Sequence, residues 1–128
     1  MHEGLTAMVI LLLEDDVQVR FFILKLLKAD GFTVLTAGEG EAALEASRNY
    51  PGSIDLLLSD VETPRMSGLE LYKIIAVERP GIKALMISGD FRNRQQVAII
   101  GLPFLQKPFS PAALRHRIGT LLHPAAKN

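Results

Sequence analysis

Carboxylates, one hydroxyl and one ammonium group stand at the ends of apolar runs along this 128-residue sequence. Four such runs are followed or closed by a chemically capable side chain: Glu14 and Asp15, then Asp60, Ser88 and Lys107. Carboxylates held close together repel one another unless a cation lies among them. Hard divalent ions such as Mg²⁺ prefer oxygen ligands of this kind and share them with phosphate oxygens. These residue types therefore indicate a magnesium site beside a phosphoryl group.

Each polar group suits a separate task in phosphoryl chemistry. Asp60 is the best candidate nucleophile, because an aspartate can form an acyl phosphate. The Lys107 ammonium would pair with Asp60 at rest and with a phosphoryl oxygen after transfer. Ser88 could donate its hydroxyl to the same phosphoryl group, and Gly89 beside it leaves space for the phosphate to enter. Catalytic roles are therefore expected for Asp60, Lys107 and Ser88.

Positioning these groups together requires a parallel sheet. The apolar runs lack alternation, which is typical of strands buried on both faces; they are Met8–Leu13, Thr33–Thr36, Ile54–Ser59, Lys83–Ser88 and Phe104–Gln106. Segments with helical spacing separate them: Val17–Ala29, Glu41–Arg48, Ser67–Val77, the weaker Arg92–Ile100, and Ser110–Leu122. Alternating strands and helices predict an α/β fold, a doubly wound five-stranded parallel sheet with helices on both faces. Ligands bind beyond the carboxyl ends of such strands, so the polar groups should converge there.

Four motifs in this order resemble the receiver (response regulator) domains of two-component signalling. They are Leu11–Asp16, Asp55–Leu71, Met86–Gly89 and Phe104–Phe109, each at the end of a predicted strand. The resemblance covers about residues 7–122, so residues 1–128 are expected to form a single receiver domain with the flavodoxin-like topology of that family.

The stretch between the third and fourth motifs is shorter than is usual in the family. A brief, Arg-rich segment at Asp90–Gln96 leads to Gly101-Leu102-Pro103 just before the last strand. We therefore expect the fourth helix to be short or irregular. This segment is most similar to the carboxyl-terminal receivers of hybrid histidine kinases.

The resemblance implies a metal site and a phosphoacceptor. Glu14 and Asp15 match the acidic pair that holds Mg²⁺, with Mn²⁺ as a possible substitute, and Asp60 and the backbone carbonyl of Glu62 complete the protein ligands. Asp60 matches the aspartate that takes a phosphoryl group from a phosphohistidine. The implied partner is a histidine kinase or a histidine phosphotransfer domain.

The resemblance also implies a switch. Ser88 matches the hydroxyl that moves toward the phosphate, and Lys107 matches the phosphate-binding lysine. Phe104 matches the aromatic residue whose rotamer reports the switch, although Tyr is commoner there. The Lys107–Pro108 peptide is expected to be cis. Such a protein is a signalling switch that catalyses its own aspartyl phosphorylation and dephosphorylation, and it is not a metabolic enzyme.

Alternative functions have weaker support from the sequence. A pseudo-receiver acting only as a protein-interaction module is disfavoured by the complete set of Asp60, Glu14, Asp15 and Lys107. A flavin-binding domain of similar topology would need a phosphate-cradling loop where Glu14 and Asp15 stand. A phosphohydrolase with an aspartate nucleophile would need further groups to position water, and none is evident.

Composition narrows the choice of partners. The sequence has 14 Lys and Arg against 14 Asp and Glu, which gives no net charge. Direct binding to nucleic acid or to a membrane surface is therefore not expected. The absence of cysteine fits a reducing compartment, and the longest apolar run, Ala7–Leu13, is too short to span a bilayer. Cytoplasmic localisation is the expectation, whereas the oligomeric state, the pathway and the output stay open.

The predicted first helix is apolar on two sides. One stripe should face the sheet: Val19, Phe22, Ile23, Leu26 and Leu27. A second strip consists of Val17, Phe21 and Leu24 at positions i, i+4 and i+7. We interpret this strip as a docking surface for a helical partner that bears the phosphohistidine. The alternative explanation of the strip is a neighbouring domain of a longer chain, or scattered exposed residues.

Overall fold

The computed structural model describes residues 7–123, in which five strands alternate with five helices. In chain order they are β1 (Val9–Leu13), α1 (Val17–Ala29), β2 (Thr33–Ala37), α2 (Gly40–Asn49), β3 (Leu56–Asp60), α3 (Gly68–Glu78), β4 (Lys83–Ser88), α4 (Asn93–Ile99), β5 (Phe104–Gln106) and α5 (Pro111–Leu122). Every element predicted from the sequence is present, and its ends differ from the prediction by no more than two residues. Within residues 7–123, no helix is long and apolar enough to cross a membrane.

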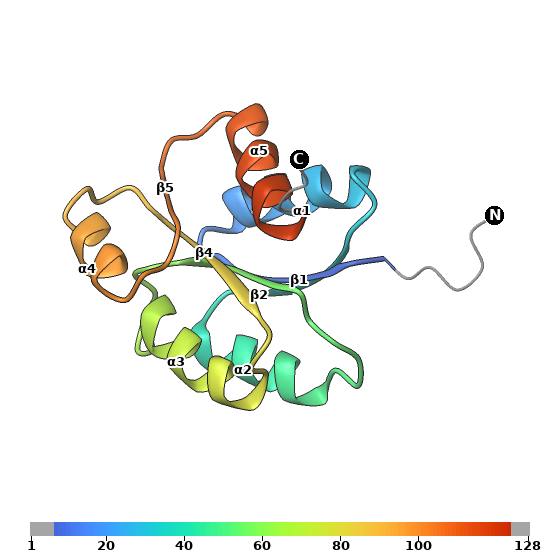
Figure 1. Ribbon diagram of the computed structural model, residues 1–128. Helices are drawn as coiled ribbons and strands as arrows, with labels where there is room; N and C mark the ends of the chain where they lie inside the picture. Colours follow the sequence, from blue (N-terminus) through green and yellow to red (C-terminus); the bar gives the residue numbers. More distant parts are fainter. Residues whose placement is uncertain (1–6, 124–128) are drawn as a thin grey trace.

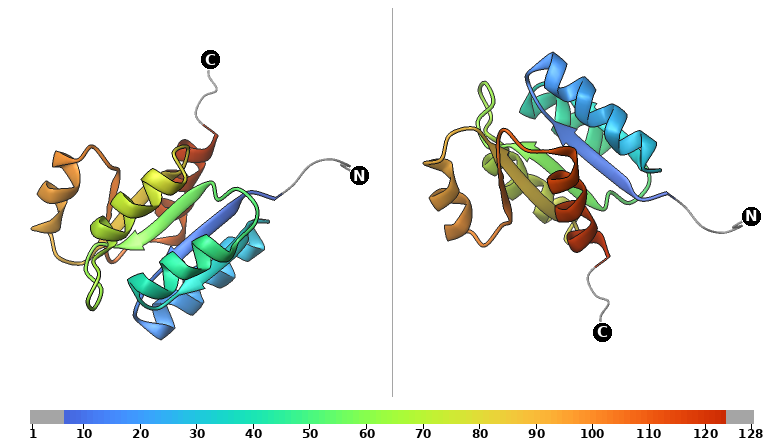
Figure 2. Two further views of the ribbon diagram at one scale, coloured as in Figure 1. Left: turned by 90° about the horizontal axis from the view of Figure 1, so that it is seen from below. Right: turned by 90° about the horizontal axis from the view of Figure 1, so that it is seen from above.

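The five strands form one parallel sheet in the order β2-β1-β3-β4-β5. Helices α1 and α5 cover one face, whereas α2 and α3 cover the other (Figures 1 and 2). Strand β1 lies between β2 and β3; after β1 the chain forms the edge strand β2, and it then crosses to the other side of β1 to form β3, β4 and β5 in turn. The predicted doubly wound, five-stranded fold is confirmed.

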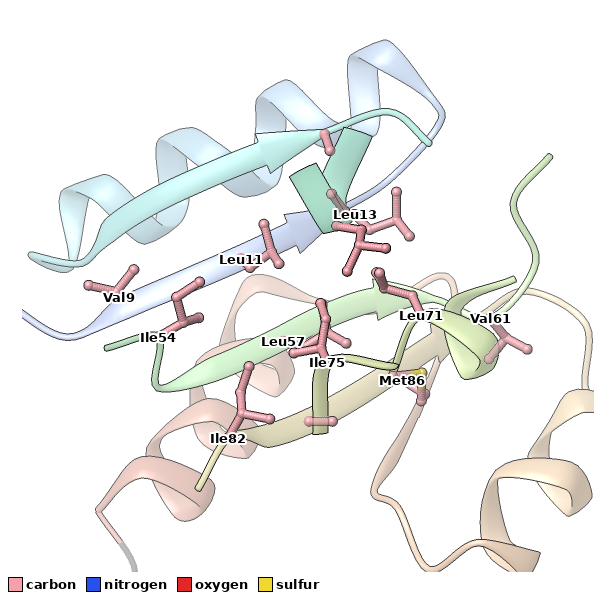
Figure 3. Packing of buried hydrophobic residues seen from close by; sticks show 14 of the residues in the cluster. Val9, Leu11, Leu13, Ile54, Leu57, Val61, Leu71, Ile75, Ile82 and Met86 are labelled. Carbon is pink, nitrogen blue, oxygen red and sulfur yellow. The ribbon is translucent and has the colours of Figure 1, made fainter. Parts of the chain in front are cut away.

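Two apolar cores, one on each face of the sheet, explain why the strands show no alternation. In β1, Leu11 and Leu13 point into the core beneath α2 and α3, while Ile10 and Leu12 point into the core beneath α1 and α5. Figure 3 shows the first of these cores, with Leu57 of β3 and Ile75 of α3 packed beside Leu11. Because successive strand residues face opposite sides, a strand with helices on both faces needs apolar residues throughout.

Side-chain caps fix where three of the helices begin, and hence how the loops at the sheet edge run. Asp16 is the N-cap of α1 and accepts hydrogen bonds from the N–H groups of Gln18 and Val19. Ser67 and Glu70 form a reciprocal capping box at the start of α3, an arrangement that satisfies two free donors. Ser110 caps α5, with Pro111 as its first residue. Each capped helix starts just after a loop that leaves the carboxyl edge of the sheet.

Helix α4 is short, as the sequence predicted. It spans seven residues, and only Asn93 and Val97 are buried. Its N-cap, Arg92, makes no capping hydrogen bond through its side chain. The helix ends where Gly101 adopts a φ of 77°, a left-handed conformation that glycine adopts without strain. With so few inward-facing residues, α4 has little packing to extend it.

Candidate functional site

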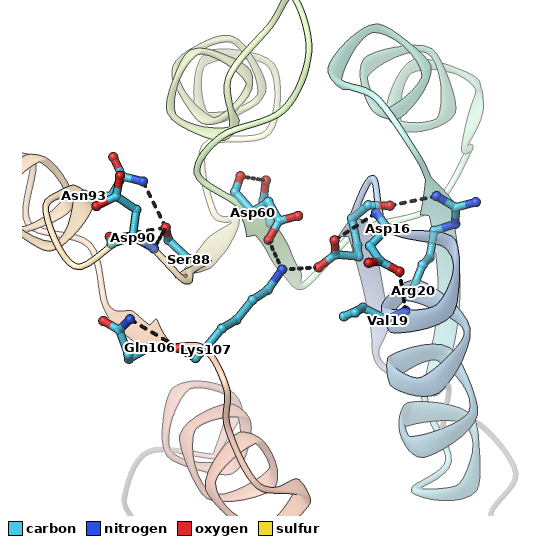
Figure 4. A network of polar contacts seen from close by, with 11 residues as sticks. Asp16, Val19, Arg20, Asp60, Ser88, Asp90, Asn93, Gln106 and Lys107 are labelled. Carbon is cyan, nitrogen blue, oxygen red and sulfur yellow. Dashed lines mark hydrogen bonds and ion pairs between the residues drawn. The ribbon is translucent and has the colours of Figure 1, made fainter.

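An ion-pair cluster lies at the carboxyl edge of the sheet, where β1, β3 and β5 end. The Lys107 ammonium lies 2.8 Å from Oδ1 of Asp60 and 2.7 Å from Oε1 of Glu14. Figure 4 shows the Lys107 side chain extending from the end of β5 to reach Asp60. Asp60 is only 4% exposed and Glu14 is fully buried. One lysine therefore bridges two buried carboxylates that are 46 positions apart in the sequence.

The Glu14 carboxylate is held on both of its oxygens. Oε1 accepts from Lys107, and Oε2 accepts from the backbone N–H of Asp16 at 3.0 Å. The Arg20 guanidinium donates to the Glu14 carbonyl oxygen at 2.7 Å, which fastens the loop to α1. Neighbouring Asp15 is exposed, yet one oxygen from each of Glu14, Asp15 and Asp60 lies within 4.8 Å of the others. The predicted acidic group is thus brought together.

Burial and charge shift the titration of this cluster. Burial, followed by the contact with Glu14, raises the pKa of Asp60 from 3.8 to about 8 against the opposing effect of Lys107. For Lys107 burial acts to lower the pKa, but the hydrogen bonds and charges of Asp60 and Glu14 outweigh it, so the pKa lies above its ordinary 10.5. The cluster contains three carboxylates and one ammonium, and it is short of positive charge.

A divalent cation fits this donor set. The three carboxylates offer hard oxygen ligands that converge within 4.8 Å, the kind of ligand that Mg²⁺ takes in small number while keeping several waters. A bound cation would also supply the positive charge that the cluster lacks. The fourth expected ligand belongs to Glu62, whose side chain is exposed in the loop after β3; the role of its carbonyl stays a prediction.

The start of α3 packs directly against the backbone of Asp60. A Cβ atom placed on Gly68 would lie 1.9 Å from the Asp60 carbonyl oxygen and 2.6 Å from Oγ of Ser59. The Gly68 N–H donates to the Val61 carbonyl at 2.8 Å, and Ser59 Oγ donates to the Asp60 carbonyl at 2.7 Å. Only glycine leaves room for this approach, so the first residue of α3 packs directly against the backbone of Asp60.

Ser88 lies at the end of β4, beside the cluster, but its hydroxyl is engaged elsewhere. Its Oγ accepts from the backbone N–H of Asp90 and from the side-chain amide of Asn93, each at 2.9 Å. Figure 4 shows these contacts on the α4 side of Ser88. Phe104, the other expected switch residue, is half-buried and packs against the core beneath α2 and α3. The Lys107–Pro108 peptide is cis, as predicted.

Three residues at the site have no counterpart among those predicted from the sequence. Arg20 braces Glu14, Asn93 holds Ser88, and the side-chain amide of Gln106 donates to the carbonyl of Gly89 at 3.1 Å. Each contacts a residue five or more positions away in the sequence, a pairing that spacing alone does not reveal. Gly68 lies within the motif Asp55–Leu71, but its close contact with Asp60 is visible only in three dimensions.

The exposed face of α1 adjoins this edge of the sheet. Val17 is 67% exposed and Phe21 is 59% exposed, while Leu24 is half-buried. The prediction that Phe22 faces the sheet is wrong, because 46% of it is exposed. Phe22 instead lines an apolar groove of about 450 Å³ together with Val19, Gly89, Lys107, Pro108 and Phe109.

Comparisons with curated proteins find relatives that are longer than this chain. The chain is 34% identical over 116 residues to the sensor kinase CckA of Brucella abortus, covering 88% of this chain and 12% of that protein. It is 33% identical over 118 residues to the transcriptional regulatory protein CpxR of Escherichia coli, covering 88% of this chain and 48% of CpxR. The chain therefore spans half or less of the length of these relatives.

Solved structures share the fold along nearly the whole chain. The receiver domain of the hybrid histidine kinase CckA is 35% identical, with a TM-score of 0.73 over 89% of this chain and 98% of that one. The response regulator TrrA of Thermotoga maritima, solved in complex with Mg²⁺ and BeF, is 26% identical, with a TM-score of 0.79 over 90% of this chain and 99% of that one. The pseudo-receiver alternative gains no support from these matches.

Residues 10–119 match the family described as the response regulator receiver domain, a span that contains Glu14, Asp60, Ser88 and Lys107. The match covers all five strands of the sheet except the first residue of β1. The ordered motifs, the sheet topology and the clustered carboxylates agree with it. The chain accordingly belongs to the response regulator receiver domain family of two-component signalling.

Proposed function

We propose that Asp60 is the phosphoacceptor of this receiver domain and that it takes a phosphoryl group from a phosphohistidine on a partner protein. The observation that supports Asp60 most is its position: it is held at the end of β3 with the Lys107 ammonium 2.8 Å from Oδ1. Glu14 is a poorer nucleophile because both of its carboxylate oxygens are already engaged. Asp15 is exposed and lies outside the ion pairs that position the other two.

In the proposed reaction a carboxylate oxygen of Asp60 attacks phosphorus in line with the imidazole of the donor. A phosphorus–oxygen bond forms while the phosphorus–nitrogen bond breaks, and the imidazole nitrogen keeps the electron pair. Lys107 then pairs with a phosphoryl oxygen, and the Ser88 hydroxyl donates a hydrogen bond to the same group. Attack by water on phosphorus later returns Asp60 to a carboxylate and releases phosphate.

The metal site is part of this proposal. Glu14, Asp15, Asp60 and the Glu62 carbonyl would hold Mg²⁺, or Mn²⁺ in its place. When bound, the ion supplies positive charge that offsets the phosphoryl oxygens and favours the ionised, nucleophilic form of Asp60. Ser88 and Phe104 are proposed to form the switch: movement of the hydroxyl toward the phosphoryl group leaves room for the ring of Phe104 to turn further inward.

The proposal is tested with small phosphodonors. Intact mass spectrometry after incubation with acetyl phosphate and Mg²⁺ should show one added phosphoryl group, and both Asp60→Ala and chelation of the metal should abolish it. Lys107→Ala should leave metal binding in place and slow the transfer. No added mass on the parent protein would overturn the proposal and favour a pseudo-receiver that acts only through protein contacts.

We further propose that Val17, Phe21 and Leu24 on α1 form the docking surface for the phosphohistidine partner. This strip adjoins the apolar groove lined by Phe22 and Phe109, which opens beside Lys107. Phe21 stays exposed although Lys25 lies over its ring at 5.4 Å. A helical partner laid along α1 could cover these apolar groups and present its histidine toward Asp60.

Docking is separated from chemistry by comparing two phosphodonors. Phe21→Ser with Leu24→Ser should slow transfer from a phosphorylated histidine phosphotransfer domain or kinase, while phosphorylation by acetyl phosphate is unchanged. The exposed Gln95→Ser in α4 serves as a matched control away from α1. Equal slowing with both donors would show that the substitutions disturb the site, and unchanged transfer from the protein donor would remove α1 from the interface.

A further inference from the structure

The Ser88 hydroxyl has its hydrogen-bonding capacity filled by the loop that leads into α4. A serine hydroxyl has one hydrogen to donate and two lone pairs that accept. The two lone pairs accept from Asp90 N and from Asn93 Nδ2, each at 2.9 Å. The hydrogen is directed to the Asp90 carbonyl at a longer 3.3 Å. Among residues 7–123 no hydrogen bond joins Ser88 to Asp60, so this orientation of the hydroxyl does not serve a group on the aspartate.

Within residues 7–123, Asn93 supplies the one hydrogen bond to the Ser88 hydroxyl that comes from a side chain. It is 5% exposed and is the first residue of α4, where its backbone N–H also donates to the Asp90 carbonyl at 3.0 Å. The other polar residues of α4, including Arg94, Gln95 and Gln96, are exposed. A buried amide is costly unless it is hydrogen-bonded, and the Asn93 amide donates to the hydroxyl of Ser88. Ser88 directly follows Ile87, which pairs with Asp60 across the sheet.

We propose that Asn93 is a positioning residue that holds the Ser88 hydroxyl toward α4 and so opposes its movement toward a phosphoryl group on Asp60. This inference rests on the proposed function of Asp60 and Ser88. When the hydroxyl turns to donate to the phosphoryl group, the buried amide of Asn93 loses its acceptor. Either the amide stays buried without an acceptor, which costs free energy, or the start of α4 shifts with the hydroxyl. The same contact therefore opposes phosphorylation and couples it to α4.

The test is a double-mutant cycle with beryllofluoride, a stable mimic of the phosphoryl group. Isothermal titration calorimetry in excess Mg²⁺ is applied to the parent chain, Asn93→Ala, Ser88→Ala and the double variant. Loss of the restraint should tighten beryllofluoride binding by roughly two- to tenfold in the chain that has Ser88, the range expected of one hydrogen bond. With Ser88 already replaced by alanine, removal of the amide should change nothing, because no hydroxyl is left to restrain.

A purely structural role for Asn93 would give a different pattern. Loss of packing would change binding by the same factor in both backgrounds, or not at all, and either result overturns the proposal. Asn93→Leu keeps the branched shape of the buried side chain without the amide and should tighten binding as Asn93→Ala does. This second variant tests the proposal if Asn93→Ala fails to fold. Gln96→Ala, which removes an exposed amide from the same helix, is the matched control and should bind as the parent does. If the parent chain itself does not bind beryllofluoride, the proposed function of Asp60 fails first, and that outcome is distinct from a failed cycle.

Discussion

Replacing Asp60 with asparagine should stabilise the folded protein when divalent metal is absent. The carboxylate is 4% exposed, and burial together with Glu14 raises its pKa from 3.8 to about 8. Asparagine keeps the shape of the side chain and removes the charge. Lys107 still has a partner in the variant, because the Glu14 carboxylate lies 2.7 Å from its ammonium. The substitution therefore removes a buried group that must take up a proton on folding at neutral pH, and it leaves Lys107 paired.

The size of the effect follows from the pKa of Asp60. Between pH 3.8 and about 8 the folded protein keeps a proton that the unfolded chain has released, so the free energy of unfolding falls as the pH rises. At about 1.4 kcal/mol for each pH unit, the loss from this one group reaches at most about 4 kcal/mol at neutral pH. We expect Asp60→Asn to raise the free energy of unfolding by roughly 2–4 kcal/mol at neutral pH and to leave it almost unchanged near pH 4.

Urea unfolding followed by circular dichroism, with a chelator present, measures this difference at several pH values. Excess Mg²⁺ should stabilise the parent more than the variant, because Asp60 is a proposed ligand, and should narrow the gap. Equal stability of the two proteins at neutral pH would refute the electrostatic reasoning. A gain of the same size near pH 4 would also refute it, because close to the unfolded-state pKa of 3.8 the uptake of a proton by Asp60 on folding costs almost nothing.

Four further substitutions, one of them a comparison, test other parts of the structure. Gly68→Ala should lower the free energy of unfolding by about 3 kcal/mol or more and slow phosphorylation, since its Cβ would lie 1.9 Å from the Asp60 carbonyl oxygen. Gly119→Ala in α5, where nothing lies within 4 Å of the added Cβ, should instead raise the free energy of unfolding by about 1 kcal/mol. Urea unfolding that gave the two variants the same stability would contradict this account. Arg79→Met should lower the free energy of unfolding by about 2–4 kcal/mol in the same assay. The guanidinium donates to one hydroxyl and three carbonyls, at the end of α2 and in the loop that follows it, at 2.8–2.9 Å. Unchanged stability would show that those hydrogen bonds are dispensable. Glu62→Asn should change the rate of hydrolysis of the phosphoaspartate several-fold, because it replaces a carboxylate two positions after Asp60 with a neutral amide. Equal rates of phosphate release in the variant and the parent would remove Glu62 from that role.

The sequence was sufficient to predict the sheet and the place of the charged groups. Strands with helices on both faces must be apolar throughout. The continuous apolar runs Leu11–Leu13 and Leu56–Leu58 therefore predicted buried strands, and all six residues are buried. Because parallel strands end at one edge, the positions of Asp60 and Lys107 after such strands were enough to bring them together. The N-cap role of Asp16 was also predictable, because helix starts favour aspartate.

Side-chain orientation was less accessible. The spacing located Ser88 at a strand end, but the direction of its hydroxyl depends on Asn93, five positions later and buried by the packing of α4. Helical periodicity predicted that Phe22 faces the sheet, yet the ring is 46% exposed and lines a groove with Pro108 and Phe109, residues that are distant in the sequence. The close approach of Gly68 to Asp60 depends on the path of the β3–α3 loop. These features arise from tertiary packing, which local sequence patterns do not encode.

The central claim is that Asp60 carries the phosphoryl group, and chemical mapping of the modified residue tests it most directly. Borohydride reduces an acyl phosphate to the alcohol, which converts a phosphorylated aspartate to homoserine. After treatment with acetyl phosphate and Mg²⁺ followed by borohydride, peptide mass spectrometry should find homoserine at position 60 and intact carboxylates at Glu14 and Asp15. Reduction at either of those two residues instead, or no reduced residue in a protein that has gained phosphoryl mass, would contradict the assignment.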